Sequence, residues 1–478
     1  MGFRRGYDSI FCGFFAAAIF GVWIAGWIAA GLNDGNPELP LSNAALSGVR
    51  FSEETSTDRQ PVETEPVEFS YLSTYSDDRG AAVNAKWNCY YADSFFEGSA
   101  YQYRQDLALA SLCLSMAAFN SAAGGTEAYC MKGENVEALL RDLGFEKIAL
   151  YGYDQEPGIN SVGAAFAQKE IRTKGKAYTL IAAAVRGNGY GKEWIGNFHV
   201  GAGRTHKGFR SAAGRLGARL NTYLKEYRDV LQPDLKLWLV GYSRGAAAAD
   251  LMAASLDTGH LIQLDSVTLD PENLYVYGFE TPNTTRDDRA GAACYRNIFH
   301  LMNPADLVGK LPPEAWGYRR YGNTLYFPSV SNAGAEASRI RIYQKISGGH
   351  ICSFSPEWEA DAETLTEMIA ERFPDPGAYS LFLIRLLPEA GRIRTKTCKW
   401  NRIMELAFRE ASDPDNGTAF YKRLKMDSEK CPDPGMFLIT QIKHAHYPEV
   451  CLSWMETVSA GKAELESRSV EEKQKQKS

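Results

Sequence analysis

The stretch 237–250 constrains the fold of this 478-residue chain more than any other. It reads Leu-Trp-Leu-Val-Gly-Tyr-Ser-Arg-Gly-Ala-Ala-Ala-Ala-Asp, so a short apolar run passes through a Gly-x-Ser-x-Gly turn into an alanine-rich run. The apolar run Leu237–Val240 predicts a buried strand, and the residues from Ala246 onward predict a helix. A serine between such a strand and such a helix occupies a strained turn that presents its hydroxyl group.

Gly241 and Gly245 are expected to have a steric role in this turn. Side chains two residues to either side of Ser243 would collide with neighbouring backbone. The following helix directs its N-terminus at the serine, where it stabilises an oxyanion. The pattern therefore makes Ser243 a candidate nucleophile. A turn of purely structural importance is the alternative, because the five-residue pattern by itself is short.

Strand and helix patterns alternate along much of the chain. This alternation predicts an α/β fold with a mostly parallel central sheet flanked by helices. Further strand candidates are Tyr178–Val185, Leu274–Phe279 and Asn297–Met302. Apolar residues recur at helical spacing from Phe209 to Tyr227, which predicts a crossover helix before the serine turn. Asp106–Asn120 is apolar nearly all round and predicts a buried helix.

The N-terminal segment predicts a membrane anchor. Ile10–Leu32 contains no charged residue and is long enough to cross a bilayer as a transmembrane helix. Arg4 and Arg5 precede it and Asp34 follows it, so the positive-inside bias places the catalytic domain outside the cytoplasm. A signal peptide cleaved near Ala29 is the alternative, and the protein would then be secreted.

These patterns divide the chain into four parts. Residues 1–32 are the anchor, 33–68 a flexible linker rich in Pro, Ser and Thr, 69–460 the folded domain, and 461–478 a disordered charged tail. Within the folded domain, residues from about 350 to 430 have a largely helical pattern. We expect them to form a helical insertion over or beside the sheet.

Composition excludes some classes of function. The net charge of -6 provides no basic patch, so no nucleic-acid partner is expected. The nine cysteines include no CxxC pair, so neither a metal site nor a redox motif is indicated. An exported domain is compatible with a few disulfides, but most of the cysteines are expected to be small buried apolar residues.

A nucleophilic serine needs a base and an acid that orients the base, in the chain order Ser, Asp, His for this kind of fold. Asp306 follows the strand that is predicted to end near Met302, where such an acid is expected. His446, near the end of the folded region, is the candidate base. His350 is its rival, because it follows another apolar stretch interpreted as a strand, and His444 is a neighbour. The four earlier histidines are expected to be structural: His199, His206, His260 and His300.

Several blocks, taken in order, resemble the class 3 (fungal-type) lipase family, and more closely its bacterial lipase-like relatives. The resemblance covers roughly Phe69 to Val458. The matching blocks are Ala184-Val185-Arg186-Gly187 with Trp194 and Asn197-Phe198 (the strand and oxyanion loop), His206-Lys207-Gly208-Phe209 (His-x-Gly-Phe), Gly241 to Gly245 (the nucleophile elbow), Tyr277 to Pro282 (the Phe-Gly-x-Pro strand end) and Asn303 to Pro313 (the block with the acid). Asp306 falls on the position of the family's acid, and His446 aligns with its late histidine.

The chain also departs from the family pattern. A Thr or Ser usually follows the Arg-Gly of the oxyanion loop, whereas Asn188 stands here. We expect its backbone N–H or side-chain amide to serve, together with the N–H of Arg244. Tyr242 and Arg244 replace the commonest His and Leu of the elbow. A cation at Arg244 predicts either a preference for anionic substrates or a salt bridge.

The resemblance implies a serine ester hydrolase that acts on an acyl ester or lipid and needs no cofactor. Ser243 would attack the ester carbonyl, His446 would transfer the proton, and Asp306 would orient the imidazole. An acyltransferase with the same triad is an alternative. A catalytically inactive hydrolase fold that serves as a binding or scaffold protein is another.

Overall fold

The computed structural model describes residues 50–51, 67–76, 82–119, 133–153, 158–187, 191–259, 261–264, 266–348, 354, 358–373, 375–381, 441 and 444–467. The predicted anchor, Ile10–Leu32, lies outside these residues. No helix within the described ranges is both long enough and apolar enough to cross a bilayer.

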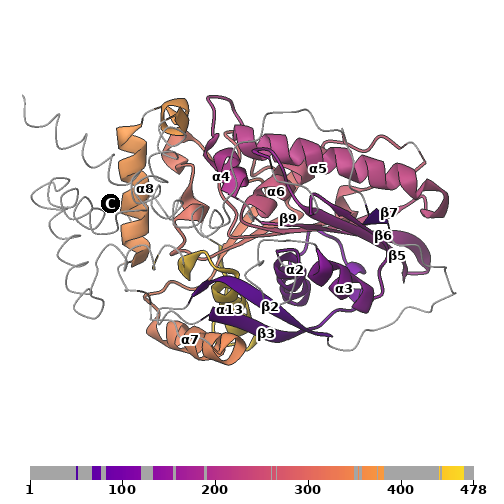
Figure 1. Ribbon diagram of the computed structural model, residues 1–478, viewed down its shortest axis with the longest axis horizontal. Coiled ribbons are helices and arrows are strands. Elements are labelled where there is room, and N and C mark those ends of the chain that lie inside the picture. Colours follow the sequence, from indigo (N-terminus) through magenta and orange to yellow (C-terminus); the bar gives the residue numbers. More distant parts are fainter. Residues whose placement is uncertain are drawn as a thin grey trace, which may run out of the picture.

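A nine-stranded mixed sheet forms the centre of the described structure, in the order β1-β4-β5-β6-β7-β8-β9-β10-β11 (Figure 1). The strands are β1 (Arg50–Phe51), β4 (Glu146–Tyr151), β5 (Ala164–Thr173), β6 (Lys176–Val185), β7 (Leu235–Tyr242), β8 (Leu274–Phe279), β9 (Ile298–Met302), β10 (Asn323–Tyr326) and β11 (Glu466–Ser467). Strands β6 to β10 pair in parallel, as predicted for the centre of the sheet. The strands outside them join antiparallel.

Helices cover both faces of this sheet (Figure 1). One face holds α5 (Lys207–Glu226) and α6 (Arg244–Asp257), and the other holds α2 (Gln105–Ala117), α3 (Glu134–Asp142) and α13 (Pro448–Ser459). The other elements are a separate hairpin of β2 (Val67–Ser76) and β3 (Ala82–Cys89), the helices α4 (Gly191–Phe198), α7 (Ala333–Ser347) and α8 (Trp358–Arg372), and the 3-10 turns η1 (Asp93–Phe96), η2 (Arg228–Val230), η3 (Pro271–Asn273), η4 (Ala293–Tyr295), η5 (Val308–Lys310) and η6 (Glu314–Trp316).

Strand β7 shows how the two faces make two apolar cores. Every residue of β7 is buried. Because successive side chains of a strand point to opposite faces, Trp238 and Val240 contribute to the core beneath α2, whereas Leu237 and Leu239 contribute to the core beneath α6. A strand covered on both faces reads as a continuous apolar run, which is why the sequence predicts it.

The predicted elements around the serine turn are confirmed. The four strand candidates correspond to β6, β7, β8 and β9, and the residues with helical spacing lie in α5. The all-round apolar stretch is α2, in which every residue from Ala110 to Ala117 is buried. Three of the described cysteines, Cys89, Cys113 and Cys451, are buried, and Cys294 is exposed.

The strand interpreted before His350 is wrong, because this stretch is helix α7. Ile340 and Ile342 alternate with polar residues, as in a strand, but local signals favour a helix. The helix begins after Asn332, whose side chain accepts the N–H of Ala335 at 3.2 Å, and ends at Gly348, where φ is 66°. Packing of α7 against α13 then stabilises the helix.

Two edge strands lie in segments that were predicted to lack structure. Arg50–Phe51, within the predicted linker 33–68, pairs with β4, and Glu466–Ser467, within the predicted tail 461–478, pairs with β10. Edge pairing uses backbone hydrogen bonds and needs few apolar side chains, so composition does not reveal it. Of the predicted insertion from about 350 to 430, α8 is helical as expected, whereas residues 382–440 lie outside the described ranges.

Asp257, at the end of α6, makes the stability of the fold depend on pH. Its Oδ1 accepts a hydrogen bond from Asn297 Nδ2 at 3.0 Å, and its buried Oδ2 has no partner among the described residues. Burial raises the pKa of this carboxyl from 3.8 to about 7. The folded state therefore keeps a proton that the unfolded state loses, and stability falls as the pH rises from 3.8 to about 7.

We predict that Asp257→Asn removes this fall, because the amide can still accept the hydrogen bond and never ionises. The unfolding temperature of the variant should exceed that of the wild type at about pH 8 and should match it at about pH 4. Asp229→Asn, at an exposed aspartate of η2, is the control and should behave alike at both pH values. Equal effects of Asp257→Asn at both pH values would contradict the prediction.

Candidate active site

Ser243 lies in a strained turn between β7 and α6. Its backbone has φ 51° and ψ -122°, a conformation that side chains rarely adopt. Hydrogen bonds on both sides hold it there: its N–H donates to Phe279 O at 2.9 Å, and its carbonyl accepts the N–H of Ala247 at 2.9 Å. The neighbouring strand and the following helix therefore determine the position of the serine.

The two glycines of the turn allow this close approach. A Cβ atom on Gly241 would lie 2.6 Å from the carbonyl carbon of Gly245 and 2.7 Å from the N atom of Ala246. A Cβ atom on Gly245 would collide with the carbonyl oxygens of Val185 and Arg186 at the end of β6. The expected steric role of both glycines is thus seen directly in the packing of β6, β7 and α6.

The structure brings Ser243, His446 and Asp306 together from three distant parts of the chain. Ser243 Oγ lies 2.8 Å from His446 Nε2, and His446 Nδ1 lies 2.8 Å from Asp306 Oδ2. All three side chains are buried. Because the carboxylate accepts at Nδ1, that nitrogen carries the ring hydrogen and Nε2 can accept the serine proton. This arrangement is able to activate a serine hydroxyl.

Asp306 is oriented by the backbone of its own loop. Its Oδ1 accepts the N–H of Val308 at 2.9 Å, and its Oδ2 also accepts the N–H of Gly309 at 3.1 Å. These N–H groups begin the short turn η5, so the loop after β9 forms a cradle around the carboxylate. Such hydrogen bonds favour an ionised carboxylate in a fixed orientation.

Two further residues hold the turn that contains His446. Tyr242 Oη donates to the carbonyl oxygen of His446 at 3.0 Å, and Asn303 Nδ2 donates to the carbonyl oxygen of Ala445 at 2.9 Å. The sequence marks Tyr242 only as a departure from the commonest elbow residue. Its contact with a residue 204 positions away requires the tertiary structure.

The other histidines have different surroundings. His300 is fully buried and binds Thr281 Oγ1 at 2.9 Å and Asp250 Oδ1 at 3.1 Å, which fits the predicted structural role. The ring of His444 lies beside that of Tyr447, with 6.0 Å between centroids. His350 and the oxyanion candidate Asn188 lie outside the described residues.

Arg244 presents no free cation beside the serine and forms no salt bridge in the described structure, which corrects both expectations. Its guanidinium is buried and donates to Asn197 Oδ1 at 2.8 Å, to Ser161 O at 3.1 Å and to Ile159 O at 3.3 Å. Burial lowers the pKa of Arg244 to about 10. The side chain fastens α4 to the start of α6, while its backbone N–H is the first of α6 after the serine.

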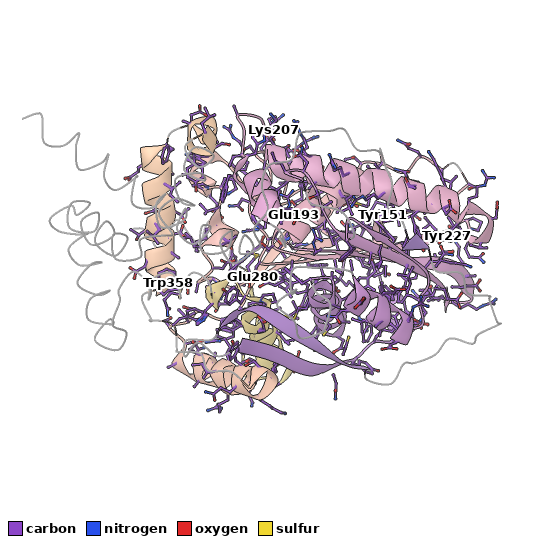
Figure 2. All side chains as sticks on the ribbon, in the orientation of Figure 1. Tyr151, Glu193, Lys207, Tyr227, Glu280 and Trp358 are labelled. Carbon is purple, nitrogen blue, oxygen red and sulfur yellow. The ribbon has the colours of Figure 1, made fainter. Side chains whose placement is uncertain are left out.

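A buried ion pair joins α4 to the end of β6, in addition to the contacts of Arg244. Arg186 Nη2 lies 2.6 Å from Glu193 Oε1, and both side chains are almost fully buried. Ser161 Oγ donates to the same carboxylate oxygen at 3.1 Å. Glu193 lies at the inner side of α4, beneath the start of α5 (Figure 2). The ion pair thereby joins helix α4 to the residue that follows β6.

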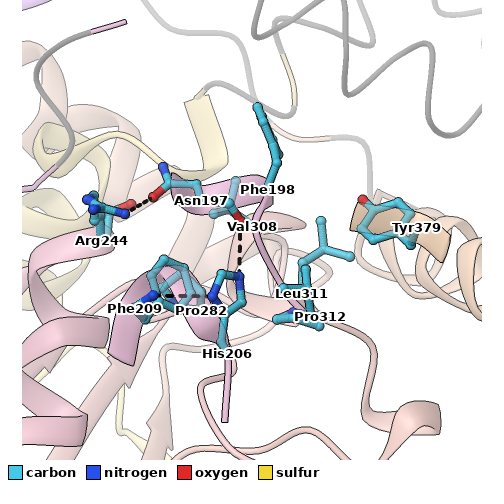
Figure 3. A pocket seen from close by; sticks show the side chains of 12 residues that line it. Asn197, Phe198, His206, Phe209, Arg244, Pro282, Val308, Leu311, Pro312 and Tyr379 are labelled. Atoms are coloured by element: carbon cyan, nitrogen blue, oxygen red, sulfur yellow. Dashed lines mark hydrogen bonds between the residues drawn. The ribbon is translucent and has the colours of Figure 1, made fainter. Parts of the chain in front are cut away.

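A pocket beside Ser243 is mostly apolar (Figure 3). It encloses about 490 Å³ of space, including its open mouth, and its apolar lining comprises Phe198, Val200, Phe209, Val308, Leu311 and Pro312. Tyr379, in the helical stretch 376–381, lines the side opposite Phe209 (Figure 3).

His206 is the buried histidine of this pocket, and it is uncharged. Its Nδ1 accepts the N–H of Phe209 at 3.3 Å, so Nε2 carries the hydrogen and donates to Asn197 O at 3.0 Å (Figure 3). Burial lowers the pKa of His206 to about 3. The expected structural role of this histidine holds, but the sequence does not reveal that it lines the pocket.

No cluster of three or more His, Cys, Asp and Glu side chains within the described ranges is arranged to hold a metal ion.

The parallel central sheet, the helices on both faces and the strained serine after β7 define an α/β-hydrolase-like protein. Residues 177–316 match the model of the family described as lipase (class 3). The match spans Ser243 and Asp306 and ends before His446. This match confirms the predicted resemblance to class 3 lipases. It also bears out the predicted enzyme class, a carboxylic ester hydrolase of the lipase type. The placement among bacterial lipase-like relatives stays a prediction.

Three solved structures that are similar to the chain are described as lipases. One is a triacylglycerol lipase with a serine-protease triad as its catalytic centre, at 20% identity, 47% coverage of this chain, 80% of that chain and a TM-score of 0.33. The Rhizomucor miehei lipase propeptide complex is 20% identical, with coverages of 53% and 76% and a TM-score of 0.29. The lipase from Rhizopus microsporus var. chinensis is 16% identical, with coverages of 47% and 75% and a TM-score of 0.31. Likenesses at these scores do not establish a shared fold. No curated protein matches the chain in sequence.

We predict that Gly245→Ala destabilises the fold and abolishes ester hydrolysis, because the new methyl group would push α6 away from β6. Unfolding in urea and hydrolysis of a short-chain nitrophenyl ester measure the two effects. Gly214→Ala, inside α5 with no atom within 4 Å of the added Cβ, is the matched control. It should retain activity and stabilise the fold by about 0.5–1 kcal/mol. An active Gly245→Ala enzyme of normal stability would contradict this account.

Proposed function

We propose that this protein hydrolyses acyl esters through a Ser243-His446-Asp306 triad and a covalent acyl-enzyme. The observation that supports this function best is the pair of 2.8 Å hydrogen bonds that links the three side chains. The three residues are buried together beside an apolar pocket. A structural serine turn would need neither a histidine at hydrogen-bonding distance nor a carboxylate on the other ring nitrogen.

In the proposed mechanism, Ser243 Oγ attacks the ester carbonyl carbon while His446 Nε2 takes the hydroxyl proton. The tetrahedral intermediate collapses when the imidazolium donates this proton to the leaving alcohol oxygen, and the acyl group remains on the serine. Water then repeats both steps and releases the acid. Asp306 holds the Nδ1–H throughout and stabilises the imidazolium.

We assign the oxyanion to the start of α6. The N–H of Arg244 directly follows Ser243, and the partial positive charge of the helix N-terminus lies there. Asn188, at the end of the block Arg186-Gly187, is the proposed second donor. The buried ion pair of Arg186 and Glu193 supports this role, because it fixes the backbone that leads into the loop.

The pocket indicates an uncharged, apolar acyl group. Its lining is mostly aliphatic and aromatic, His206 is neutral, and the guanidinium of Arg244 donates to protein oxygens. A carboxylate or phosphate bound in this pocket would therefore find no free cation among the residues that line it. We propose lipids or other esters with apolar acyl chains as the substrates.

We further propose that the hydrolase domain lies outside the cytoplasm. This proposal rests on the sequence of residues 1–32 alone. An uncleaved segment would anchor the domain at the membrane, close to lipid, whereas cleavage would release a secreted enzyme.

We predict that a fluorophosphonate probe labels the wild-type protein and that Ser243→Ala abolishes the labelling. His446→Ala should reduce the labelling rate by about 10³-fold or more, because the serine loses its base. His350→Ala and His444→Ala are the controls and should leave the rate within about threefold of wild type, since substitutions that leave a triad intact change little. Absence of labelling in a well-folded wild-type protein would instead favour a non-catalytic binding role. If His350→Ala strongly reduced the labelling rate, His350 and not His446 would be the base.

We predict that Val308→Phe shortens the acyl pocket. Hydrolysis of nitrophenyl decanoate should lose roughly tenfold in kcat/KM relative to nitrophenyl acetate, since steric exclusion of a few methylene groups has effects of this size. Val230→Phe, at a valine that is 55% exposed, is the matched control and should change neither rate. An unchanged ratio between the two esters in Val308→Phe would place the acyl chain elsewhere.

A further inference from the structure

A second buried acid, Glu280, lies directly beside the triad and has no part in the proposed mechanism. Its side chain is fully buried near the centre of the molecule (Figure 2). Its backbone φ is 45°, a value that favours glycine. In the block that resembles Phe-Gly-x-Pro, Glu280 stands at the place of that glycine. Glu280 therefore combines an unfavourable backbone conformation with a buried acidic side chain.

Hydrogen bonds of Glu280 reach the loop that holds the triad acid. Both of its carboxyl oxygens lie 3.0 Å from the backbone N of Asn303, which donates to them. Asn303 begins this loop, and its side chain donates to Ala445 O, next to His446. Glu280 therefore fastens the residue that connects the loop of Asp306 with the turn of His446.

The carboxyl group of Glu280 also interacts electrostatically with that of Asp306, and the charge of Asp306 favours the protonated form of Glu280. Two carboxyl groups in buried contact cannot both be ionised, because the repulsion between the like charges is not screened by water. The pair of carboxyl groups therefore carries one proton. Burial, followed by the charge of Asp306, raises the pKa of Glu280 well above its ordinary value of 4.5.

The loop contacts decide which of the two acids holds the proton. Asp306 accepts hydrogen bonds from Val308 N, Gly309 N and His446 Nδ1, which favour its ionised form. Glu280 receives only one N–H, that of Asn303, which its two oxygens share. The proton therefore belongs to Glu280.

We propose that Glu280 is a positioning residue of this active site: as a neutral acid it donates a hydrogen bond to Asp306 and, through Asn303, holds the turn of His446. The inference rests on the proposed triad. Its chemical consequence is that Asp306 stays ionised in a fixed orientation while the imidazolium forms. Glu280 touches no reacting atom and acts through Asp306.

Other titratable and charged groups surround this pair. The guanidinium of Arg320 donates hydrogen bonds to the backbone carbonyl oxygens of Thr281 and Gly309. Burial, followed by the charges of Glu280 and Asp306, raises the pKa of the Cys451 thiol, so this thiol stays protonated. Tyr242 also interacts electrostatically with both Glu280 and Asp306. The positive charge of Arg320 lowers the pKa of Glu280, but burial and the charge of Asp306 raise it more.

We predict different outcomes for two variants of similar size. Glu280→Gln keeps an acceptor for Asn303 N–H and a donor for Asp306, so its kcat should remain within about threefold of wild type. Glu280→Met keeps the length but loses both hydrogen bonds, and kcat should fall about 10- to 100-fold with little change in KM, because the base is misplaced. Thermal unfolding of both variants shows whether they fold. Wild-type kcat in a folded Glu280→Met variant would overturn the proposal.

The pH profile separates a neutral Glu280 from an ionised one. If Glu280 is neutral, Glu280→Gln should leave the acid limb of kcat/KM at the wild-type pH. If Glu280 is ionised, removal of a negative charge near His446 should move this limb about one pH unit lower. A shift of that size, or a kcat reduced more than about tenfold in Glu280→Gln, would overturn the proposal even if Glu280→Met does not fold.

Infrared spectroscopy tests the proton without any need for activity. The wild-type protein at pH 7 should show the carbonyl stretch of a protonated carboxylic acid that is missing in Glu280→Gln. Absence of this band overturns the assignment of the proton to Glu280. Presence of the band with no fluorophosphonate labelling of Ser243 would instead show that the buried acid pair exists and that the proposed function fails.

Discussion

The close contact between the ends of β6 and β7 and the start of α6 is the constraint on which the site depends. Gly241 and Gly245 let these backbones approach to distances at which a methyl group would collide. The strained φ of Ser243 is maintained because hydrogen bonds from β8 and α6 hold the residue on both sides. One short turn thus determines where the hydroxyl group lies relative to both apolar cores.

The histidine reaches this serine through packing far from the turn. Helix α13 contacts α7 and α2, and the turn before α13 holds His446 over Ser243. Tyr242 from the elbow and Asn303 from the acid loop bind the backbone of that turn. His446 is therefore positioned by a neighbour of Ser243 and by the loop of Asp306, so the three residues form one packed unit.

Buried charges around the site are neutralised or engaged by the protein itself. Arg186 pairs with Glu193, and Arg244 donates to Asn197 and to backbone carbonyls. His206 is held neutral by burial. The substrate pocket beside the serine is consequently apolar, although three basic side chains lie near it. A neutral Glu280 beside Asp306 would extend the same principle to the acids, because a protonated carboxyl group adds no second negative charge to the site.

The sequence by itself determined the central elements and the candidate nucleophile. Strand β7, helix α6 and the glycines of the elbow are local features, since periodicity and steric limits act over a few residues. Tertiary structure decided the rest. Helix α13 packs against α7, β1 and β11 pair at the edges of the sheet, and the guanidinium of Arg244 turns inward to α4. His446 meets Ser243 across 203 residues, and no local pattern encodes such a contact, because only the packing of the complete fold brings those atoms together.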